Sequence, residues 1–554
     1  MKFKKFFCAL AALSGLMPFA AKGAESNNNA DTDNNKVVYS VYLRNYTNPE
    51  AAGKFGDLQA DLPRIKDLGV DVIHLLPVYE MGVEHAKGSP YCIRNYRSVD
   101  PRYGTLDEMK ELIDSIHANG MEIWLDWVGN HTAYDHPWVK AHPEWYASRQ
   151  DFDDVRSVNS ANPELRKAMA DEMRYWAEEC DIDGFRCDFA QGPGYEFWAD
   201  IISQVDPEHK LFWLAEGDEG GIANKWMRSE GGPFDSRYGW SYSEFLYKDA
   251  NRTKDVDFNR DFNKAVFHLG YPADRASFLT YIGSHDIFQG MDNAVSAATQ
   301  DAIYGDNLKP FTVMTMMAPG IPMVYMGQEI NFSQPGGVGI FTDTEAIDWS
   351  KVDEDYLAMI KKLIELRHNQ PALATTSESI LVNHTTDNDS VYVFERRRGD
   401  ESVIVALNFS HHPQTFNITS SVLPKNIYDE AFTMTKADFA KNQTVTLPGK
   451  GYAVYTKDAA TPLNADTYTI GLRTKKQLKE LPQVSVTVED PLGKGGELTV
   501  MPKTTMTADK GGKTYSVAVP YLPEFGYTVT FYPGAGAEPI KFTETAPVSK
   551  TYDR

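Results

Sequence analysis

Short apolar runs recur between residues 37 and 327, and longer amphipathic segments separate them. Each run has the length of a buried strand of a parallel sheet, which is continuously apolar because both of its faces are covered. The runs are 37–43, 70–78, 121–128, 182–189, 211–217, 278–283 and 321–327. This alternation predicts an α/β fold in which helices cover a parallel sheet.

The segments between the runs carry helix signals. In 106–119 the apolar residues lie on one face, and Thr105 with Glu108 forms a capping box before it. In 162–180 Asn162 is the expected N-cap and a second apolar stripe follows. We expect a (β/α)8 TIM barrel. A doubly wound open sheet is the alternative, but no glycine-rich phosphate turn follows the first run.

The pattern changes after residue 372, where short alternating strands with turns between them replace the helical segments. We therefore predict a catalytic barrel over 37–372, with a very short insert at 132–161 after the third strand. An antiparallel β-sandwich domain follows at 373–458, and an additional β-rich domain at 459–554. The last domain either binds polysaccharide or is a passive stabilising module, and the sequence does not separate these roles.

The N-terminus resembles a secretory signal. Residues 1–23 combine a basic end, an apolar stretch and small residues at the expected cleavage site, and the polar residues 24–36 form a linker. A membrane anchor is the alternative, but the apolar stretch is short for the about 20 residues that span a bilayer. We expect cleavage, a secreted or periplasmic protein, and no later membrane span.

The net charge and the aromatic content limit the classes of molecule that this protein is expected to bind. Lys and Arg total 55 and Asp and Glu total 77, which gives a net charge of −22 that repels phosphate backbones and excludes nucleic acid. Aromatic residues make up 12% of the chain and suit an uncharged ligand with ring faces, such as a sugar. Cleavage would remove Cys8 and leave an odd number of cysteines, so we expect free, buried thiols at Cys92, Cys180 and Cys187.

Several of the apolar runs end in charged or polar residues. In a parallel barrel the carboxyl ends of the strands converge on one mouth, so these side chains should meet there. They are Asp126, Asn130, His131, Arg186, Asp188, Glu216, His285 and Asp286. Two carboxyl groups about 5 Å apart are what retaining glycoside cleavage requires. Taken singly, each has a plainer explanation: a buried ion pair for Arg186 with Asp188, a helix cap for Glu216, a core histidine for His131.

Taken together and in order, these motifs resemble the α-amylase superfamily of glycoside hydrolases. DWVGNH is similar to the D-x-x-x-N-H motif of the third strand, GFRCD to G-F-R-x-D of the fourth, and SHD to N-H-D of the seventh. LAEG is similar to the fifth-strand glutamate segment, and PGIPMVYMGQE to the stretch around the eighth strand. The resemblance covers about residues 37–458.

The resemblance implies a role for each motif residue. Asp188 would be the nucleophile, Glu216 the general acid/base, and Asp286 the third carboxylate, which binds sugar hydroxyls. The resemblance also implies that five further residues bind or position the substrate. Arg186 would orient Asp188, His131 and His285 would hydrogen-bond the sugar, Tyr91 would stack on it, and Asp126 would support Arg186.

The sequence departs from the family pattern in three places. Gln191 and Gly192 stand where many α-amylases have Lys-His, whose histidine carbonyl helps to hold the family's calcium. The insert is short, and Ser157 stands where an aspartate ligand is common. We therefore predict no certain cofactor, and keep calcium as an alternative at a site built from Asn130 and the acidic residues of 151–154. Ser284 replaces the asparagine of N-H-D, which predicts a tuned site.

The resemblance implies an enzyme that hydrolyses α-1,4 bonds in starch, maltodextrin or related α-glucans with retention. An α-glucan transglycosylase or isomerase with the same site is the first alternative. A non-catalytic glucan-binding protein is the second, which the presence of all three carboxylates disfavours. Endo or exo action, tolerance of α-1,6 bonds and oligomeric state stay open.

Overall fold

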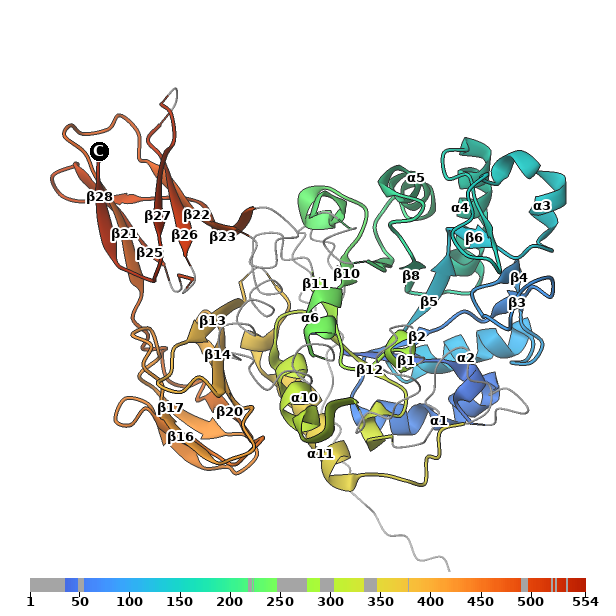
Figure 1. Cartoon of the computed structure of the whole chain (residues 1–554), viewed down its shortest axis with the longest axis horizontal. Coiled ribbons are helices and arrows are strands. Elements are labelled where there is room, and N and C mark those ends of the chain that lie inside the picture. The colour runs from blue at the N-terminus through green and yellow to red at the C-terminus, as the bar shows by residue number, and fades with distance from the viewer. Residues whose placement is uncertain are drawn as a thin grey trace, which may run out of the picture.

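The chain folds into a (β/α)8 barrel followed by two β domains, which lie beside the barrel in Figure 1. This computed structural model describes residues 35–47, 54–217, 222, 224–246, 277–288, 303–332, 346–376, 378–489, 497–519, 522–523, 526–534 and 537–554. The predicted signal, residues 1–23, and all but the last two residues of the predicted linker, 24–36, lie outside the described residues.

The barrel is closed, which confirms the predicted fold class. Its parallel strands are β1 (Val38–Val41), β2 (Val72–Leu75), β5 (Glu122–Val128), β8 (Gly184–Asp188), β9 (Phe212–Ala215), β10 (Ser236–Tyr238), β11 (Ser277–Thr280) and β12 (Ile321–Tyr325). β1 pairs with both β2 and β12, so no edge is left open and the open-sheet alternative is wrong. The seven predicted runs each supply a strand. β10 was missed because its sequence, SRY, is short and is not apolar.

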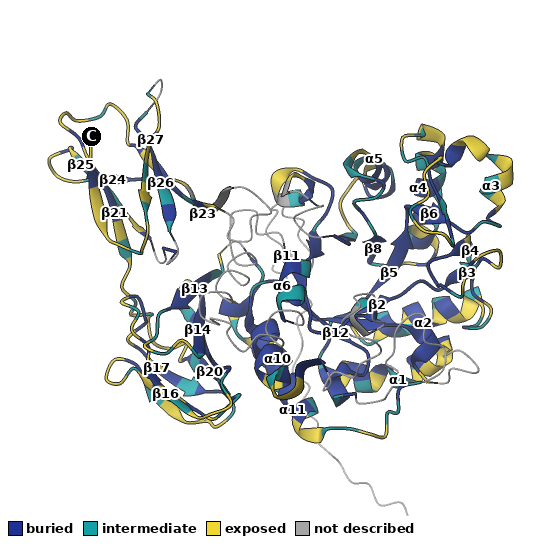
Figure 2. Ribbon diagram, viewed as in Figure 1, coloured by how far each residue is buried: buried dark blue, intermediate teal, exposed yellow. Residues whose placement is uncertain are grey.

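Helices cover the barrel and place their apolar faces against it, so burial falls from the strands outward in Figure 2. They are α1 (Phe55–Leu68), α2 (Leu106–Ala118), α4 (Pro163–Glu179), α5 (Tyr195–Val205), α6 (Trp240–Glu244), α8 (His285–Phe288), α10 (Leu308–Met317) and α11 (Glu354–Asn369). The predicted capping box is present before α2, where the Thr105 side chain accepts from the Glu108 N–H at 3.2 Å. The predicted Asn162 N-cap begins α4. Among the described residues, no helix is long and apolar enough to cross a membrane.

The strand that carries GFRCD packs closely against its neighbours. A Cβ atom on Gly184 would lie 2.6 Å from the carbonyl oxygen of Phe212, so only glycine fits at this position. The ring of Phe212 stacks on that of Trp124, with ring centroids 4.2 Å apart. Since side chains alternate along a strand, Arg186 and Asp188 project to the same face at its carboxyl end.

Two additional segments are inserted after the barrel strands β2 and β5. After β2 the chain forms the hairpin β3 (Tyr79–Met81) and β4 (Ile93–Val99). After β5 comes the short insert, which contains α3 (Pro137–Ala141) and the two-residue strands β6 (His131–Thr132) and β7 (Arg156–Ser157), which pair with each other. The pairing of β6 with β7 brings the two ends of the insert side by side.

The first β domain shares its core with the barrel. Its sheets contain β13 (Ile380–His384), β14 (Val391–Arg398), β15 (Glu401–Asn408), β20 (Tyr452–Lys457), β17 (Ile427–Glu430) and β18 (Lys436–Asp438), and the pair β16 (Gln414–Asn417) and β19 (Thr444–Leu447). One face of β14 and β15 joins the barrel's hydrophobic cluster, and the other face lines a separate core. This domain is therefore packed onto the barrel rather than tethered to it.

The last domain has its own hydrophobic core between two four-stranded sheets. Its strands are β21 (Tyr468–Arg473), β22 (Gln483–Glu489), β23 (Glu497–Thr505), β24 (Thr507–Ala508), β25 (Thr514–Val519), β26 (Tyr527–Tyr532), β27 (Ile540–Glu544) and β28 (Lys550–Asp553). In Figure 1 it lies next to the first β domain, and the C-terminus is part of it.

Candidate active site

One buried arginine joins carboxylates from three adjacent barrel strands. Nη1 of Arg186 lies 2.7 Å from Oδ1 of Asp126 and 2.8 Å from Oδ1 of Asp188. Nη2 of Arg186 lies 2.8 Å from Oε1 of Glu216, which directly follows β9. Arg186 is completely buried, and the carboxylates are nearly so. The structure therefore gathers these four predicted residues around a single guanidinium.

Burial changes the protonation of these carboxyl groups. It raises the pKa of Glu216 to about 8 and that of Asp188 to about 7, while the positive charge of Arg186 opposes both shifts. The same balance raises the pKa of Asp126 to about 6. Three negative charges around one positive charge cannot all be compensated, so protons are retained near neutral pH. Glu216, with the highest of the three pKa values, is the group best suited to donate one.

The backbone after Asp188 holds Glu216 in place. The N–H of Phe189 donates to Oε2 of Glu216 at 2.5 Å. Phe189 has a φ of 42°, in the left-handed region that a bulky residue rarely adopts. Such strain persists only where surrounding contacts impose it, and it is common at functional sites. The strained turn fixes the position of Glu216 relative to Asp188.

A second group of predicted residues adjoins the first through Tyr91. Its hydroxyl donates to Oδ2 of Asp126 at 2.8 Å and lies 3.1 Å from Nε2 of His285. The same His285 nitrogen lies 3.4 Å from Oδ1 of Asp286, whose side chain is 29% exposed. His131 makes a hydrogen bond to the backbone of Tyr91. All eight predicted site residues thus form one connected network at the barrel mouth.

The two predicted histidines are neutral. Burial lowers the pKa of both His131 and His285 to about 4. A neutral imidazole can donate or accept a hydrogen bond without adding charge to the site. Both are therefore suited to hold the hydroxyl groups of an uncharged ligand.

Sequence reasoning missed two members of this network. Nε2 of His74, on β2, lies 3.8 Å from Oδ2 of Asp126, and burial holds the pKa of His74 well below its usual value. The hydroxyl of Tyr238 accepts from Nε of Arg186 at 3.4 Å. His74 interrupts an apolar strand, which is a signal that the sequence contained. Tyr238 lies on β10, the strand that had no apolar signal.

The acidic residues proposed as calcium ligands do not come together. Oδ1 of Asp151 lies 2.9 Å from Nη1 of Arg149, and Asp153 pairs with Lys87 at 2.6 Å. Within the described part of the chain, no group of three or more His, Cys, Asp or Glu residues is placed to hold a metal ion. Asp151 and Asp153 are instead each paired with a basic side chain.

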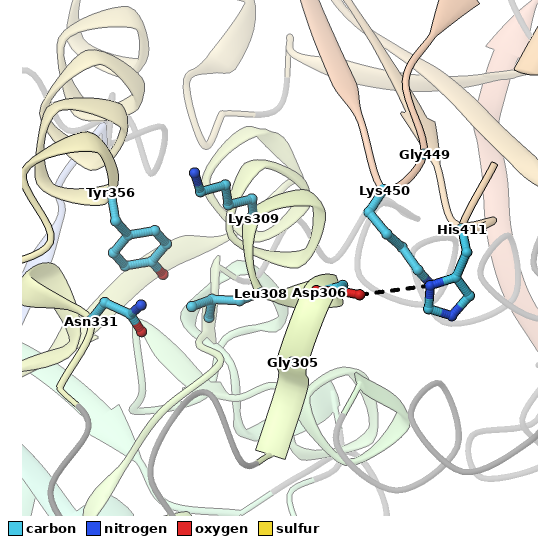
Figure 3. A pocket seen from close by; sticks show the side chains of 9 residues that line it. All are labelled: Gly305, Asp306, Leu308, Lys309, Asn331, Tyr356, His411, Gly449 and Lys450. Carbon is cyan, nitrogen blue, oxygen red and sulfur yellow. Dashed lines mark ion pairs between the residues drawn. The ribbon is translucent and has the colours of Figure 1, made fainter. Parts of the chain in front are cut away.

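A separate hollow of about 490 Å³ lies where the barrel meets the first β domain (Figure 3). It is lined by Gly305, Asp306, Leu308, Lys309, Asn331, Tyr356, His411, Gly449 and Lys450. Nζ of Lys450 donates within the protein, to Oδ1 of Asn307 at 2.8 Å and to the Phe409 carbonyl at 2.6 Å. None of the predicted site residues lines this hollow, so it is distinct from the barrel mouth.

Comparison with known families agrees with this geometry. The model of the α-amylase catalytic domain matches residues 26–154 and 140–336, and that of the α-amylase C-terminal all-β domain matches residues 382–470. The chain belongs to the α-amylase family. The superfamily resemblance is thereby confirmed.

Individual relatives are distant. The maltogenic α-amylase of Bacillus acidopullulyticus is 25% identical over 422 residues, which cover 69% of this chain and 68% of that protein. An α-1,4-glucan:maltose-1-phosphate maltosyltransferase of Rhodospirillum rubrum is 27% identical over 412 residues, 66% of this chain and 55% of that one. The chain thus spans about half to two thirds of the length of such relatives.

Among solved structures, a noncanonic maltogenic α-amylase, AmyB, from Thermotoga neapolitana is similar in fold and sequence. It superimposes with a TM-score of 0.61 at 25% identity, and the match covers 78% of this chain and 98% of that one. The part of this chain that such a match leaves uncovered amounts to roughly one domain of ordinary size.

Proposed function

We propose that this protein is a retaining glycoside hydrolase that cleaves α-1,4-glucosidic bonds in starch, maltodextrin or related α-glucans. The observation that carries the proposal is that one guanidinium contacts both Asp188 and Glu216 through its two terminal nitrogens. Retaining enzymes place their two carboxyl groups about 5 Å apart, whereas inverting enzymes leave room for a water between them. Two carboxylates that share one guanidinium support the shorter separation.

In the first step, Glu216 protonates the glycosidic oxygen while a carboxylate oxygen of Asp188 attacks the anomeric carbon. The bond from that carbon to the leaving oxygen breaks, and a covalent sugar ester forms on Asp188. In the second step, Glu216 takes a proton from water, and the water oxygen attacks the same carbon. The ester breaks, which releases the sugar with its original configuration and restores both carboxyl groups.

The surrounding residues support these two steps. Arg186 favours the ionised form of Asp188, which the attack requires. Asp286, the most exposed of the predicted carboxylates, accepts hydrogen bonds from the ring hydroxyls. His131 and His285 bind the same ring in their neutral forms, and Tyr91 packs against it.

Hydrolysis of soluble starch and maltooligosaccharides tests the proposal, with the anomeric form of the first product followed by NMR. We expect turnover with the α-anomer formed first, and no turnover by Asp188→Asn. Binding of maltooligosaccharide by the variant distinguishes an enzyme from a binding protein. A folded wild-type protein without turnover on any α-glucan would contradict the proposal.

Transfer to a second sugar is the alternative, and two observations favour keeping it. A maltosyltransferase is among the relatives. Phe152 of the insert packs edge-to-face on Phe189, with ring centroids 5.9 Å apart, which makes an apolar surface next to the nucleophile. Enzymes that transfer must limit the access of water to the covalent intermediate. Longer or isomerised sugars in the product mixture would identify transfer.

We also propose that the protein is secreted or periplasmic, because residues 1–23 resemble a cleaved signal. N-terminal sequencing of the mature protein from its native compartment tests this. A mature chain that begins near residue 24 supports export, and a retained N-terminus in a cytoplasmic fraction contradicts it.

A further inference from the structure

The insert and the turn after β8 meet at the place where the family resemblance implies calcium. The residues of this chain at the corresponding positions are Asn130, Ser157 and the carbonyl group of Gly192. Calcium requires six to eight oxygen ligands that all present lone pairs to it. These residues can hold a metal ion only if they direct oxygen atoms, rather than hydrogen atoms, toward a common point near Asp151.

Asp151 is surrounded by hydrogen-bond donors. Its Oδ2 accepts from Nδ2 of Asn130 at 3.1 Å and from the Ser157 hydroxyl at 2.9 Å. Its Oδ1 accepts from Nη1 of Arg149 at 2.9 Å. Asn130 and Ser157 therefore offer hydrogens to this carboxylate, and the Ser157 oxygen also accepts from the Asp151 N–H at 3.0 Å. Oδ1 of Asn130, by contrast, is buried and has no hydrogen-bond partner, so it is the one side-chain oxygen of this group still open to a ligand. One open side-chain oxygen falls far short of the six to eight that calcium takes, so these residues do not fit calcium as they are arranged.

The guanidinium of Arg149 connects the two sides of this junction. While Nη1 binds Asp151 in the insert, Nη2 lies 3.5 Å from the carbonyl oxygen of Gly192 in the turn after β8. A positive charge thus lies between the carboxylate and the carbonyl group that a cation would bridge. The other paired carboxylate of the segment, Asp153, has Lys87 as its own partner.

We propose that Arg149 takes the place of the family's calcium, as a built-in cation that ties the insert to the turn after β8. The protein would then need no metal for folding or for activity. This inference goes beyond the proposed function, because it concerns how the barrel mouth is held together rather than which bond is cleaved.

The contact of Arg149 with Asp151 also affects the position of Phe152 at the active site. Phe152 directly follows Asp151, and its ring packs on His131 at 5.6 Å and on Phe189 at 5.9 Å. Both contacts are with residues of the barrel mouth. Arg149 is therefore a positioning residue, which acts on substrate binding through Phe152 without touching the reacting atoms.

Thermal unfolding of the full-length protein, with excess EGTA or with excess calcium chloride, tests the proposal without requiring activity. We expect the same Tm for the wild type in both solutions. Arg149→Gln should lower Tm by about 2–4 °C and raise KM severalfold with little change in kcat. Lys87→Gln removes the other ion pair of the same segment, whose carboxylate, Asp153, is 81% exposed against 20% for Asp151. It is the matched control and should change neither Tm nor KM.

Arg149→Lys keeps the positive charge, so this variant tests the proposal if Arg149→Gln fails to fold. We expect it to recover part of the Tm and of the KM. A wild-type Tm that falls in EGTA, or rises with calcium, would overturn the proposal. So would an Arg149→Gln variant that behaves like Lys87→Gln. Since unfolding is read independently of turnover, failure here is distinguishable from failure of the proposed hydrolase function.

Discussion

Two buried charge clusters, one at the barrel mouth and one in the first β domain, have opposite effects on their carboxyl groups. At the mouth, the pKa values of Asp188 and Glu216 are raised by burial to about 7 and about 8. In the β domain, Glu395 is equally buried, yet Arg397 and His384 lower its pKa to about 2 despite that burial. Burial alone therefore does not decide the protonation state.

The number of donors for each carboxylate explains the difference. Oε1 of Glu395 accepts from Nε of Arg397 at 2.9 Å and from the Ser402 hydroxyl at 2.6 Å. Its Oε2 accepts from Nη2 of Arg397 at 2.7 Å and lies 3.1 Å from Nε2 of His384. One carboxylate there has several donors, whereas at the mouth several carboxylates share one arginine. Several donors around one carboxylate, as at Glu395, keep it ionised and stabilise the fold. Several carboxylates around one arginine, as at the barrel mouth, keep protons that can take part in catalysis.

The largest effect that separates the two clusters should come from Asp188→Asn. We expect kcat/KM on maltooligosaccharides to fall by at least about 10⁴-fold, because removing a nucleophile removes the covalent route. Tm should not fall, since the change removes one of the negative charges that compete for Arg186. Steady-state kinetics with thermal unfolding measures both. A large loss of Tm would mean that the mouth is built for stability, like the Glu395 cluster.

The reverse result is expected for Glu395→Gln. Breaking a buried ion pair costs about 3–5 kcal/mol, because the partner charge stays buried without compensation. The free energy of unfolding should fall by that amount, while kcat of the folded protein is unchanged at a temperature where it remains native. Chemical denaturation followed by fluorescence measures the change.

Glu378→Gln is the matched control, since Glu378 pairs with Arg398 in the same domain but is 65% exposed. It should cost no more than about 1 kcal/mol. The effect of Glu395→Gln should also depend on pH. The pKa of Glu395 is lowered in the folded state, so its stabilisation is complete above its unfolded pKa of about 4.3. The stabilisation is lost as the pH falls from there toward 2, and the gap between wild type and variant should close.

A smaller effect is expected from pH on the wild-type enzyme. Asp188 must be ionised to attack and Glu216 must be protonated to donate, and their pKa values are raised to about 7 and about 8. The plot of kcat/KM against pH should therefore be bell-shaped, rising through about 7 and falling through about 8, with both limbs belonging to the coupled pair. A profile that is flat from pH 5 to pH 9 would contradict these assignments.

The smallest effect on activity is expected from chemical modification of the cysteines. Cys92, Cys180 and Cys187 are free and buried, as the sequence predicted. Burial raises the pKa of Cys92 to about 12 and that of Cys187 well above its usual value, so neither forms a reactive thiolate. Iodoacetamide should leave the activity of the native enzyme unchanged. Rapid inactivation would show that the mouth opens far more than this structure does.

The predictable parts of the molecule are those with a local signal. Apolar runs and caps predicted most barrel strands and the helices after them, and the ordered motifs placed Asp188, Glu216 and Asp286 at the strand ends. β10 and its Tyr238 carried no apolar pattern, so only the closure of the barrel reveals them. Arg149 could not be predicted either, because its partners Asp151 and Gly192 meet through tertiary packing of the insert on the barrel.

The proposed mechanism depends most on Asp188 as the nucleophile, and trapping the covalent intermediate tests this directly. The wild-type enzyme is incubated with an activated fluorosugar of the α-gluco series, digested with protease, and analysed by mass spectrometry. We predict that one glycosyl group is attached to the peptide that contains Asp188, and that Asp188→Asn is not labelled. Attachment to another carboxylate, or turnover of the reagent with inversion and without any adduct, would contradict the account.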